Sequence, residues 1–323
     1  MSKTIIGVDV GGTSIKIGWL SIQGDILHKW EIPTDTSDNG KTILTDIWES
    51  ISNSITSFNM DRDNVIGIGV GVPGFIITEE GIVDEAVNIG WKNVNVKKEL
   101  STLSGLPVCV ANDANTAVLG ENWRGAGNQA KNVLAVTIGT GVGGGIIVNG
   151  ELVSGENGTA GEIGHSTVDL NGSLCNCGKK GCLETIASAT GIVRQAQESI
   201  KVNSSSGLAQ LYSENGHLTA KDVFDLADKG DEISGGIIQH TMDVLGLSLA
   251  NVATVLNPSK ILIGGGVSNA GPALINGIRT SFQKYALPRT NKACTIKTAQ
   301  LGNDAGMIGA AFLVKQQLHH VKF

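Results

Sequence analysis

Three cysteines and one histidine lie close together in the stretch from Gly161 to Glu184. Nine residues separate the histidine from the first thiol, and the thiols follow as Cys-x-Cys-x4-Cys; the four residues are His165, Cys175, Cys177 and Cys182. Three thiolates and one imidazole form the ligand set of a closed tetrahedral zinc site. Such a site leaves no position for substrate, so we predict a structural Zn²⁺. The alternatives are a disulfide or a chance cluster of buried cysteines.

Two acids, Glu162 and Glu184, stand on either side of this group. An imidazole that binds zinc through one nitrogen is held in one tautomer, so its other nitrogen points in a fixed direction. Together with Asn112, which can donate and accept, these carboxylates and His165 are the groups needed to bind several hydroxyls of a sugar. The alternative is that both glutamates only support the metal or face solvent.

Glycine-rich turns occur at two places between strand patterns, at Gly11-Gly12-Thr13 and at Gly139-Thr140-Gly141. Backbone amides in such turns can face a bound phosphate, although a plain hairpin is the simpler interpretation. Asp9, at the end of the strand before the first turn, could hold Mg²⁺ through water. The run from Gly139 to Gly144 also fits the dinucleotide-binding pattern, but a strand follows it where a helix is required, so we reject that interpretation.

Further candidate residues lie where predicted strands end. A glycine triplet, Gly264-Gly265-Gly266, follows a strand and precedes a helix, which favours backbone lying flat against a nucleotide base. Pro73-Gly74 ends a buried strand and is a candidate pocket edge. Asn112-Asp113 stand between a strand and a helix. Such a pair is ordinarily a helix cap, but a carboxylate at the carboxyl end of a strand is also well placed to contact a ligand.

Alternating strand and helix patterns, with a glycine-rich hairpin opening each half, predict an α/β fold in two lobes with a duplicated architecture. Apolar spacing predicts helices over 41–58, 184–196 and 237–256 and a helix capped by Thr219. The polar segment 201–217 is expected to be an exposed excursion.

Composition narrows the class of protein. The 323 residues carry a net charge of −6, which gives no basic surface for nucleic acid. Forty-four glycines, without a collagen period, point to close backbone approach. A run of about eighteen apolar residues, as a membrane span needs, does not occur. Five cysteines without an export signal favour the cytoplasm. We therefore expect neither a nucleic-acid nor a membrane partner.

Two phosphate-binding turns, a candidate magnesium ligand and a hydroxyl-binding cluster together predict phosphoryl transfer from ATP to a sugar. The transition state of that reaction is loose and highly charged, so positioning and electrostatics supply most of the catalysis. One group must accept the proton of the sugar hydroxyl. Asp113 is our candidate for this general base.

These motifs resemble the ROK family (repressors, open reading frames, kinases). The resemblance spans essentially the whole chain and rests on residues 9–16, 112–115, 137–145, 161–165 and 175–184. It is closest to the glucokinases of Gram-positive bacteria, including the stretch 87–93. The resemblance implies ATP-dependent phosphorylation of the 6-hydroxyl of glucose, with Mg²⁺ as the catalytic metal and Zn²⁺ as a structural one.

The resemblance also implies an actin-like, ribonuclease H-like pair of lobes. The small lobe would comprise residues 1–115 and the last helix, 304–323; the large lobe would comprise 116–303 and carry the zinc-binding loop 161–184. Family positions assign the sugar to Gly74, Asn112, Asp113, Glu162, His165 and Glu184, with Asp113 as the base. They assign the nucleotide to Asp9, Gly11, Gly12, Thr13, Lys16, Gly139, Thr140, Gly141 and Gly264 to Gly266. A homodimer or homotetramer is expected.

Other members of the family remain alternatives. Fructokinases and N-acetylmannosamine kinases share most of the hydroxyl-binding residues. A sugar-responsive regulator without catalytic activity is disfavoured by Asp9, Gly12 and Asp113. The repressors of the family carry an N-terminal helix-turn-helix, whereas the first strand here is expected from Thr4.

Overall fold

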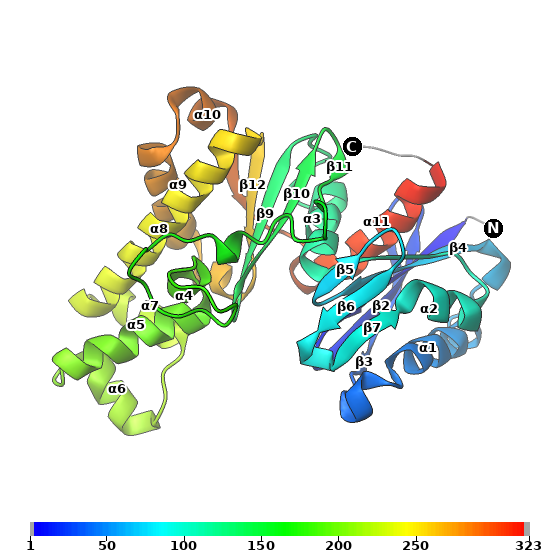
Figure 1. Ribbon diagram of the computed structural model, residues 1–323, viewed down its shortest axis with the longest axis horizontal. Helices are drawn as coiled ribbons and strands as arrows, with labels where there is room; N and C mark the ends of the chain where they lie inside the picture. The colour runs from blue at the N-terminus through cyan, green and yellow to red at the C-terminus, as the bar shows by residue number, and fades with distance from the viewer. Residues whose placement is uncertain (1–2, 320–323) are drawn as a thin grey trace. The chain divides into compact units, whose positions relative to one another are not determined.

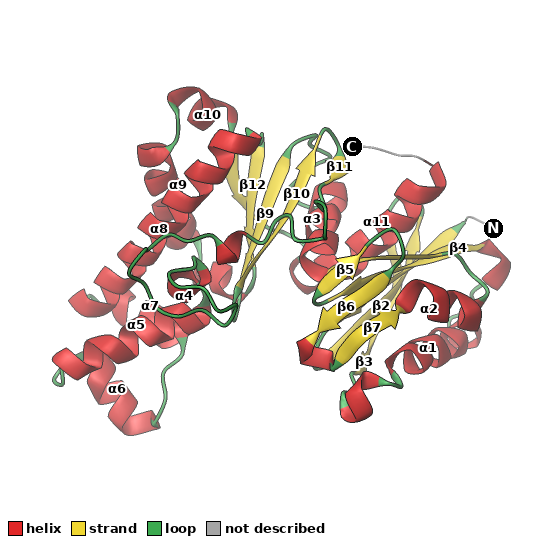
Figure 2. Cartoon of the chain, viewed as in Figure 1, coloured by secondary structure: helices red, strands yellow, loops and turns green. Residues whose placement is uncertain are grey.

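The computed structural model describes residues 3–319 (Figure 1). The chain forms two compact units, each built from segments that are distant in the sequence. Unit 1 comprises 1–133, 145–161 and 299–323, and unit 2 comprises 134–144 and 162–298. Strands and helices alternate along both, as the α/β prediction requires (Figure 2).

The main sheet of unit 1 has the strand order β3-β2-β1-β4-β8. Its strands are β1 (Thr4–Val10), β2 (Ser14–Ser21), β3 (Ile26–Pro33), β4 (Val65–Val72) and β8 (Val108–Asn112). β1 and β2, like β2 and β3, are antiparallel, whereas β1, β4 and β8 run parallel. The carboxyl ends of those three strands therefore meet at one edge of the sheet.

Four helices and a small three-stranded sheet also belong to unit 1. The helices are α1 (Ile43–Ser57), α2 (Val96–Ser104), α3 (Asp113–Arg124) and α11 (Ala305–His319), and the antiparallel sheet holds β5 (Phe75–Ile77), β6 (Ile82–Ala86) and β7 (Trp91–Asn95). The apolar stripe that predicts helix 41–58 is the buried face of α1, including Ile43, Ile47 and Ile51. Glycines let α3 and α11 touch through their backbones: a Cβ on Gly309 would lie 1.6 Å from the carbonyl oxygen of Thr116.

The second five-stranded sheet repeats the order of the first. Its strands are β9 (Val133–Ile138), β10 (Val142–Val148), β11 (Glu151–Leu152), β12 (Lys260–Gly264) and β13 (Thr295–Thr298), in the order β11-β10-β9-β12-β13. In each sheet the first three strands lie in reverse order and the next two follow on the other side of the first. This shared order is the duplication predicted from the two glycine-rich hairpins.

The remaining helices belong to unit 2. They are α4 (Glu184–Ala187), α5 (Ala189–Val202), α6 (Gly207–Asn215), α7 (Ala220–Asp228), α8 (Glu232–Leu256), α9 (Pro272–Tyr285) and α10 (Pro288–Ala293). Short 3₁₀ helices lie at Ser37–Gly40 (η1), Arg62–Asn64 (η2), Val87–Ile89 (η3), Ile163–His165 (η4), Gly266–Ala270 (η5) and Gly302–Asp304 (η6). Thr219 caps α7 in a reciprocal pair with Asp222, as predicted.

One expectation about helices was wrong, and one helix was not predicted. The helix predicted over 184–196 is broken at Ser188, whose hydroxyl accepts the N–H of Gly191 and starts α5 anew. The segment 201–217 is largely exposed, as expected, but it contains α6, which begins at the Ser206 cap and ends at Gly216 with positive φ. The two predicted lobes are bodies that would move as units, and their boundaries stay a prediction.

No helix among residues 3–319 combines the length and the apolar character of a membrane span.

Candidate functional site

The strand ends of unit 1 bring together two of the acids that the sequence singled out, Asp9 and Asp113. In the register of the parallel strands Asp9 lies opposite Gly71, and Gly71 lies opposite Ala111. Asn112 and Asp113 follow directly on β8. Asp9 and Asp113 are close enough for the charge of Asp113 to raise the pKa of Asp9.

From the sequence, a helix cap and a ligand contact were alternative roles for the pair Asn112-Asp113. Asn112 is the cap of α3: its Oδ1 accepts the N–H of Ala114 at 2.8 Å, while its Nδ2 donates to the carbonyl of Gly74 at 2.9 Å. Asp113 is the first residue of the helix, and its Oδ1 also accepts the Ala114 N–H at 2.8 Å. The cap is thus supplied by Asn112, and the second carboxylate oxygen of Asp113 is not needed for capping.

Burial raises the pKa of both carboxyls. Protein packed around the Asp113 carboxyl raises its pKa, against the lowering effect of the Ala114 amide. Burial raises the pKa of Asp9 to about 6, although Lys16, its cross-strand partner, lowers it. A Cβ on Gly306, near the start of α11, would lie 2.6 Å from the Asp9 carboxyl carbon. A carboxyl whose pKa is raised toward neutrality is a better proton acceptor than an ordinary aspartate.

The turn between β1 and β2 is exposed to solvent and is held in shape by hydrogen bonds. The N–H of Gly11 donates to the carbonyl of Ser14 at 3.0 Å, and a Cβ on Gly11 would lie 2.9 Å from that oxygen. Thr34 donates its hydroxyl to the Gly11 carbonyl and its N–H to the Thr13 carbonyl. Gly12 and Thr13 are exposed, so this turn has the rigidity and access that anion binding requires.

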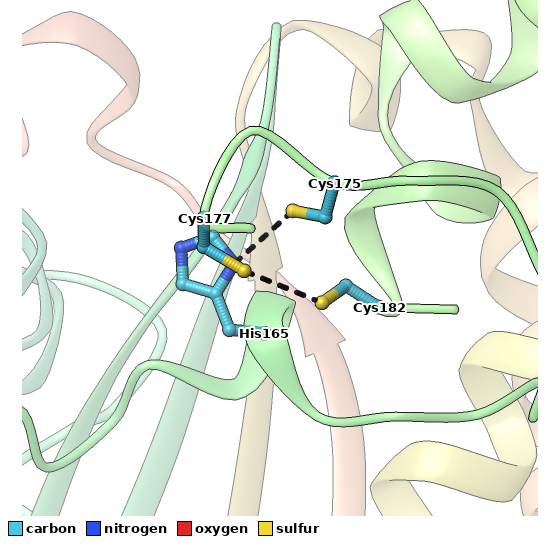
Figure 3. Close-up of side chains that lie close together, drawn as sticks. All are labelled: His165, Cys175, Cys177 and Cys182. Carbon is cyan, nitrogen blue, oxygen red and sulfur yellow. Dashed lines mark hydrogen bonds between the residues drawn. The ribbon is translucent and has the colours of Figure 1, made fainter. Parts of the chain in front are cut away.

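In unit 2 the four predicted metal ligands converge (Figure 3). Their ligand atoms all lie within 4.8 Å of one another. His165 Nδ1 is 3.6 Å from Cys175 Sγ, and the thiols of Cys177 and Cys182 are also 3.6 Å apart. Zinc–sulfur bonds of about 2.3 Å at tetrahedral angles separate the ligand atoms by roughly 3.7 Å. The donor set and its spacing therefore fit Zn²⁺, and Nδ1 is the ring nitrogen of His165 that lies near the Cys175 thiol.

Glycines and one aspartate shape the loop around the thiols. Gly178 and Gly181 have positive φ, and a Cβ on Gly181 would lie 1.6 Å from the Asp169 carbonyl oxygen. The Cys175 amide donates to the carbonyl of Lys179 at 2.7 Å. Positive φ favours glycine at both positions, and the close approach to Asp169 excludes a side chain at Gly181.

Glu184 lies between the cysteine–histidine cluster and the glycine turn of β9 and β10. Its Oε1 accepts from the Cys175 thiol at 3.0 Å and is 3.6 Å from His165 Nδ1. On its other side, a Cβ on Gly141 would lie 2.8 Å from Oε2. Glu162 precedes η4, and its carbonyl accepts the N–H of His165 at 3.1 Å. The Glu184 carboxylate therefore lies at His165, whereas the contact shown for Glu162 is through its backbone carbonyl.

The two other glycine segments of unit 2 are also held in place. The Gly139 N–H donates to the Gly141 carbonyl, while Thr190 at the start of α5 donates its hydroxyl to the carbonyl of Thr140. Gly265 has positive φ, and a Cβ there would lie 2.5 Å from the Ile138 carbonyl oxygen. Gly264 ends β12, and Gly266 begins η5.

Sequence reasoning missed two contributors to these surroundings. Gly306 lets α11 approach Asp9, although it is far away in the chain, and Thr34 braces the first glycine turn from the end of β3. Ala305-Gly306 at a helix start and Thr34 after a strand are signals too common to single out. Only the fold connects them with the site.

The fold places the chain in the class of two-domain α/β sugar kinases, as the solved structures similar to it indicate. Residues 5–317 match the ROK family, and the chain belongs to that family.

Relatives with named activities align over nearly its full length. A glucokinase of Halalkalibacterium halodurans is 51% identical over 97% of this chain and 95% of its own. A ROK glucokinase from Streptomyces griseus, solved in complex with glucose and AMPPNP, is 33% identical with a TM-score of 0.75, covering 97% of this chain and 99% of that one. The xylose repressor of Bacillus subtilis is 28% identical over 96% of this chain and 76% of its own.

Proposed function

We propose that this protein is an ATP-dependent glucokinase, which transfers the γ-phosphoryl group of ATP to the 6-hydroxyl of glucose. The observation that carries the proposal is the 51% identity, over 97% of the chain, with a protein named glucokinase. In this proposal the strand-end carboxylates, the amides of the glycine turns, His165 and the two glutamates would supply the groups that such a reaction needs.

Asp113 is the proposed general base. It would accept the proton of the 6-hydroxyl as the oxygen attacks the γ-phosphorus, and its raised pKa suits that step. Its oxygens are held in place because Asn112 caps the helix and Ala114 donates to Oδ1. Asp9 would hold Mg²⁺ that arrives with ATP, which neutralises charge on the phosphates when bound.

Hydroxyl recognition is assigned to the side chains and backbone that resemble the sugar-binding positions of the family. These are Gly74, Asn112, Asp113, Glu162, His165 and Glu184. The nucleotide is assigned to Asp9, the turn 11–13, Lys16, the turn 139–141 and the triplet 264–266. The amide of Asn112 is already oriented by its bond to Gly74, and the imidazole of His165 by its place in the thiol cluster.

A structural Zn²⁺ is part of the proposal. His165, Cys175, Cys177 and Cys182 would hold it, and when bound it would cross-link the loop. His165 would then present Nε2 in one tautomer to a hydroxyl. Assembly as a homodimer or homotetramer and a cytoplasmic location are also proposed, and analytical ultracentrifugation of the purified chain tests the assembly.

A coupled assay of ADP release tests the proposed function. Glucose, N-acetylmannosamine, mannose and fructose are compared at equal concentrations with MgATP, and we expect the highest kcat/KM with glucose. A higher kcat/KM with N-acetylmannosamine or fructose would reassign the enzyme within the family. The second candidate function is a sugar-responsive regulator, and the observation in its favour is the similarity to the xylose repressor. Absence of ADP release with every hexose, together with measurable glucose binding, would favour it.

A further inference from the structure

The last turn of α3 carries a buried carboxylate whose hydrogen-bond partners are backbone amides. Glu121 is 3% exposed. Its Oε1 accepts the N–H of Gln300 at 2.8 Å and of Leu301 at 2.6 Å, and its Oε2 accepts the N–H of Ala126 at 3.1 Å. Charge-assisted bonds to three amides fix three points of the backbone on one side chain.

The turn after α3 is built around this carboxylate. A Cβ on Gly125 would lie 2.2 Å from Glu121 Oε2, so a larger residue there would displace the side chain. A leucine or methionine in place of Glu121 would fill the space but leave the amides of Ala126, Gln300 and Leu301 without this acceptor. The backbone around Glu121 therefore needs a hydrogen-bond acceptor at this position, and an apolar side chain of similar size would not replace it.

The amides that Glu121 holds belong to two segments that lead to places where the chain passes between the two units. One passage is between Thr298 and Ala299, directly before Gln300. Another is between Val133 and Leu134, at the end of the segment that starts with Ala126.

Asn122 also holds the segment 126–133 by hydrogen bonds. Its side-chain amide exchanges two hydrogen bonds of 2.9 Å with the backbone of Ala130, and its carbonyl accepts the N–H of Gln129 at 2.7 Å. One helix end thus anchors two of the four chain passages between the units.

The other end of α3 carries Asp113. Glu121 lies eight positions after Asp113, which is about 12 Å along a helix. The helix is also locked to α11, since a Cβ on Gly120 would lie 2.1 Å from the Ala305 carbonyl oxygen. A displacement of the anchored segments would therefore be transmitted along α3 to its first turn.

We propose that Glu121 is a positioning residue, which couples the connections between the two units to the placement of the Asp113 carboxylate. The proposal rests on the proposed kinase function, in which Asp113 is the base. Glu121 touches no reacting atom; it acts by holding Ala126, Gln300 and Leu301 on the helix that carries Asp113.

Glu121→Gln is the decisive variant, because it keeps the size of the side chain but replaces one acceptor oxygen with an NH₂ group. We expect kcat with glucose to fall at least tenfold while KM for glucose changes less than threefold. Hydrogen exchange should accelerate at residues 126 and 300–301 and also at the first turn of α3, residues 114–117.

Leu100→Ala is the matched control for lost stability. Leu100 is fully buried on α2 and is not part of the chain passages. We expect it to lower the melting temperature and to leave kcat at 25 °C within twofold of wild type. If Glu121→Gln does not fold, Asn122→Ala, which loses only the side-chain pair to Ala130, should show the same pattern with a smaller decrease in kcat.

Two results would overturn the inference. Glu121→Gln with kcat within twofold of wild type at a lowered melting temperature would make Glu121 a purely structural residue. Accelerated exchange confined to 126 and 300–301, with the first turn of α3 unchanged, would remove the coupling. The exchange measurement needs no substrate, so it decides the coupling even if wild-type protein phosphorylates no hexose, a result that would contradict the proposed function instead.

Discussion

Asp113 combines a fixed position with a carboxyl that holds its proton more readily than usual. Asn112 takes the capping role, and burial raises the pKa of Asp113. In Asp113→Asn the side chain keeps its shape and loses its basicity. We expect kcat to fall by about 10² to 10⁴, the usual worth of a general base, with glucose binding nearly intact.

Steady-state kinetics and glucose titration of Asp113→Asn provide the measurement. Asp228→Asn, an exposed aspartate at the end of α7, is the control and should behave as wild type. Near-normal kcat in Asp113→Asn would remove Asp113 from the role of base.

Asp9 should oppose folding at neutral pH. Burial raises its pKa from 3.8 to about 6, so the folded chain binds more protons than the unfolded chain between these values. The free energy of unfolding therefore falls as pH rises from about 4 to 6, by about 3 kcal/mol at most. Asp9→Asn should raise the melting temperature at pH 7.5 but not at pH 4, and it should weaken MgATP binding.

Thermal denaturation at the two pH values, with KM for MgATP, measures both effects. In the wild type the apparent affinity for MgATP should fall about tenfold per pH unit below pH 6, since Asp9 must be ionised to hold the cation. An Asp9→Asn variant that is less stable at pH 7.5, or that binds MgATP normally, would contradict this account.

The shape of the loop 161–184 should depend on four clustered side chains, those of His165, Cys175, Cys177 and Cys182. Cys177→Ser removes a soft ligand, so we expect loss of Zn²⁺, faster hydrogen exchange over 161–184 and a higher KM for glucose, because His165 loses its orientation. Metal analysis and kinetics check this. Cys109→Ser, outside the cluster, should retain Zn²⁺. A zinc-free Cys177→Ser protein with normal KM would separate the metal from sugar recognition.

The contact between α3 and α11 depends on glycine. A Cβ on Gly309 would lie 1.6 Å from the Thr116 carbonyl oxygen, so Gly309→Ala must push the two backbones apart. We expect destabilisation of at least about 1–3 kcal/mol, measured by urea unfolding. Gly235→Ala on α8 is the matched control: a Cβ there meets nothing within 4 Å, so the change should be neutral or stabilise by up to about 1 kcal/mol. Equal effects of both changes would mean that the helices can separate freely.

Across the molecule, substrates should act on segments of both units. We expect slower hydrogen exchange over 9–13, 137–145 and 161–184 when glucose and a non-hydrolysable ATP analogue are both bound, because lobe closure would order these segments. Glucose alone and the analogue alone are the controls. Protection that equals the sum of the separate effects would indicate a rigid site.

Part of this architecture could be read from local patterns. Glycine turns after short apolar strands located both hairpins, and the thiol spacing located a cluster that the fold brings together. Helix α6 was missed because only Leu208 is buried along it, so its sequence lacks an apolar stripe. Ser188 broke a predicted helix because its hydroxyl caps α5, a choice that apolar spacing does not reveal.

Residue types and short spacings are sufficient for turns, caps and the ligand set of a metal, because those interactions span a few residues of chain. They determined the α/β class, the duplication and the identity of the candidate acids. The pKa of Asp9, the hydrogen bond from Asn112 to the Gly74 carbonyl, and the hydrogen bonds of Glu121 to residues 300–301 arise between segments up to 180 residues apart. Burial and long-range hydrogen bonds exist only after the chain has folded, so the structure was needed to find them.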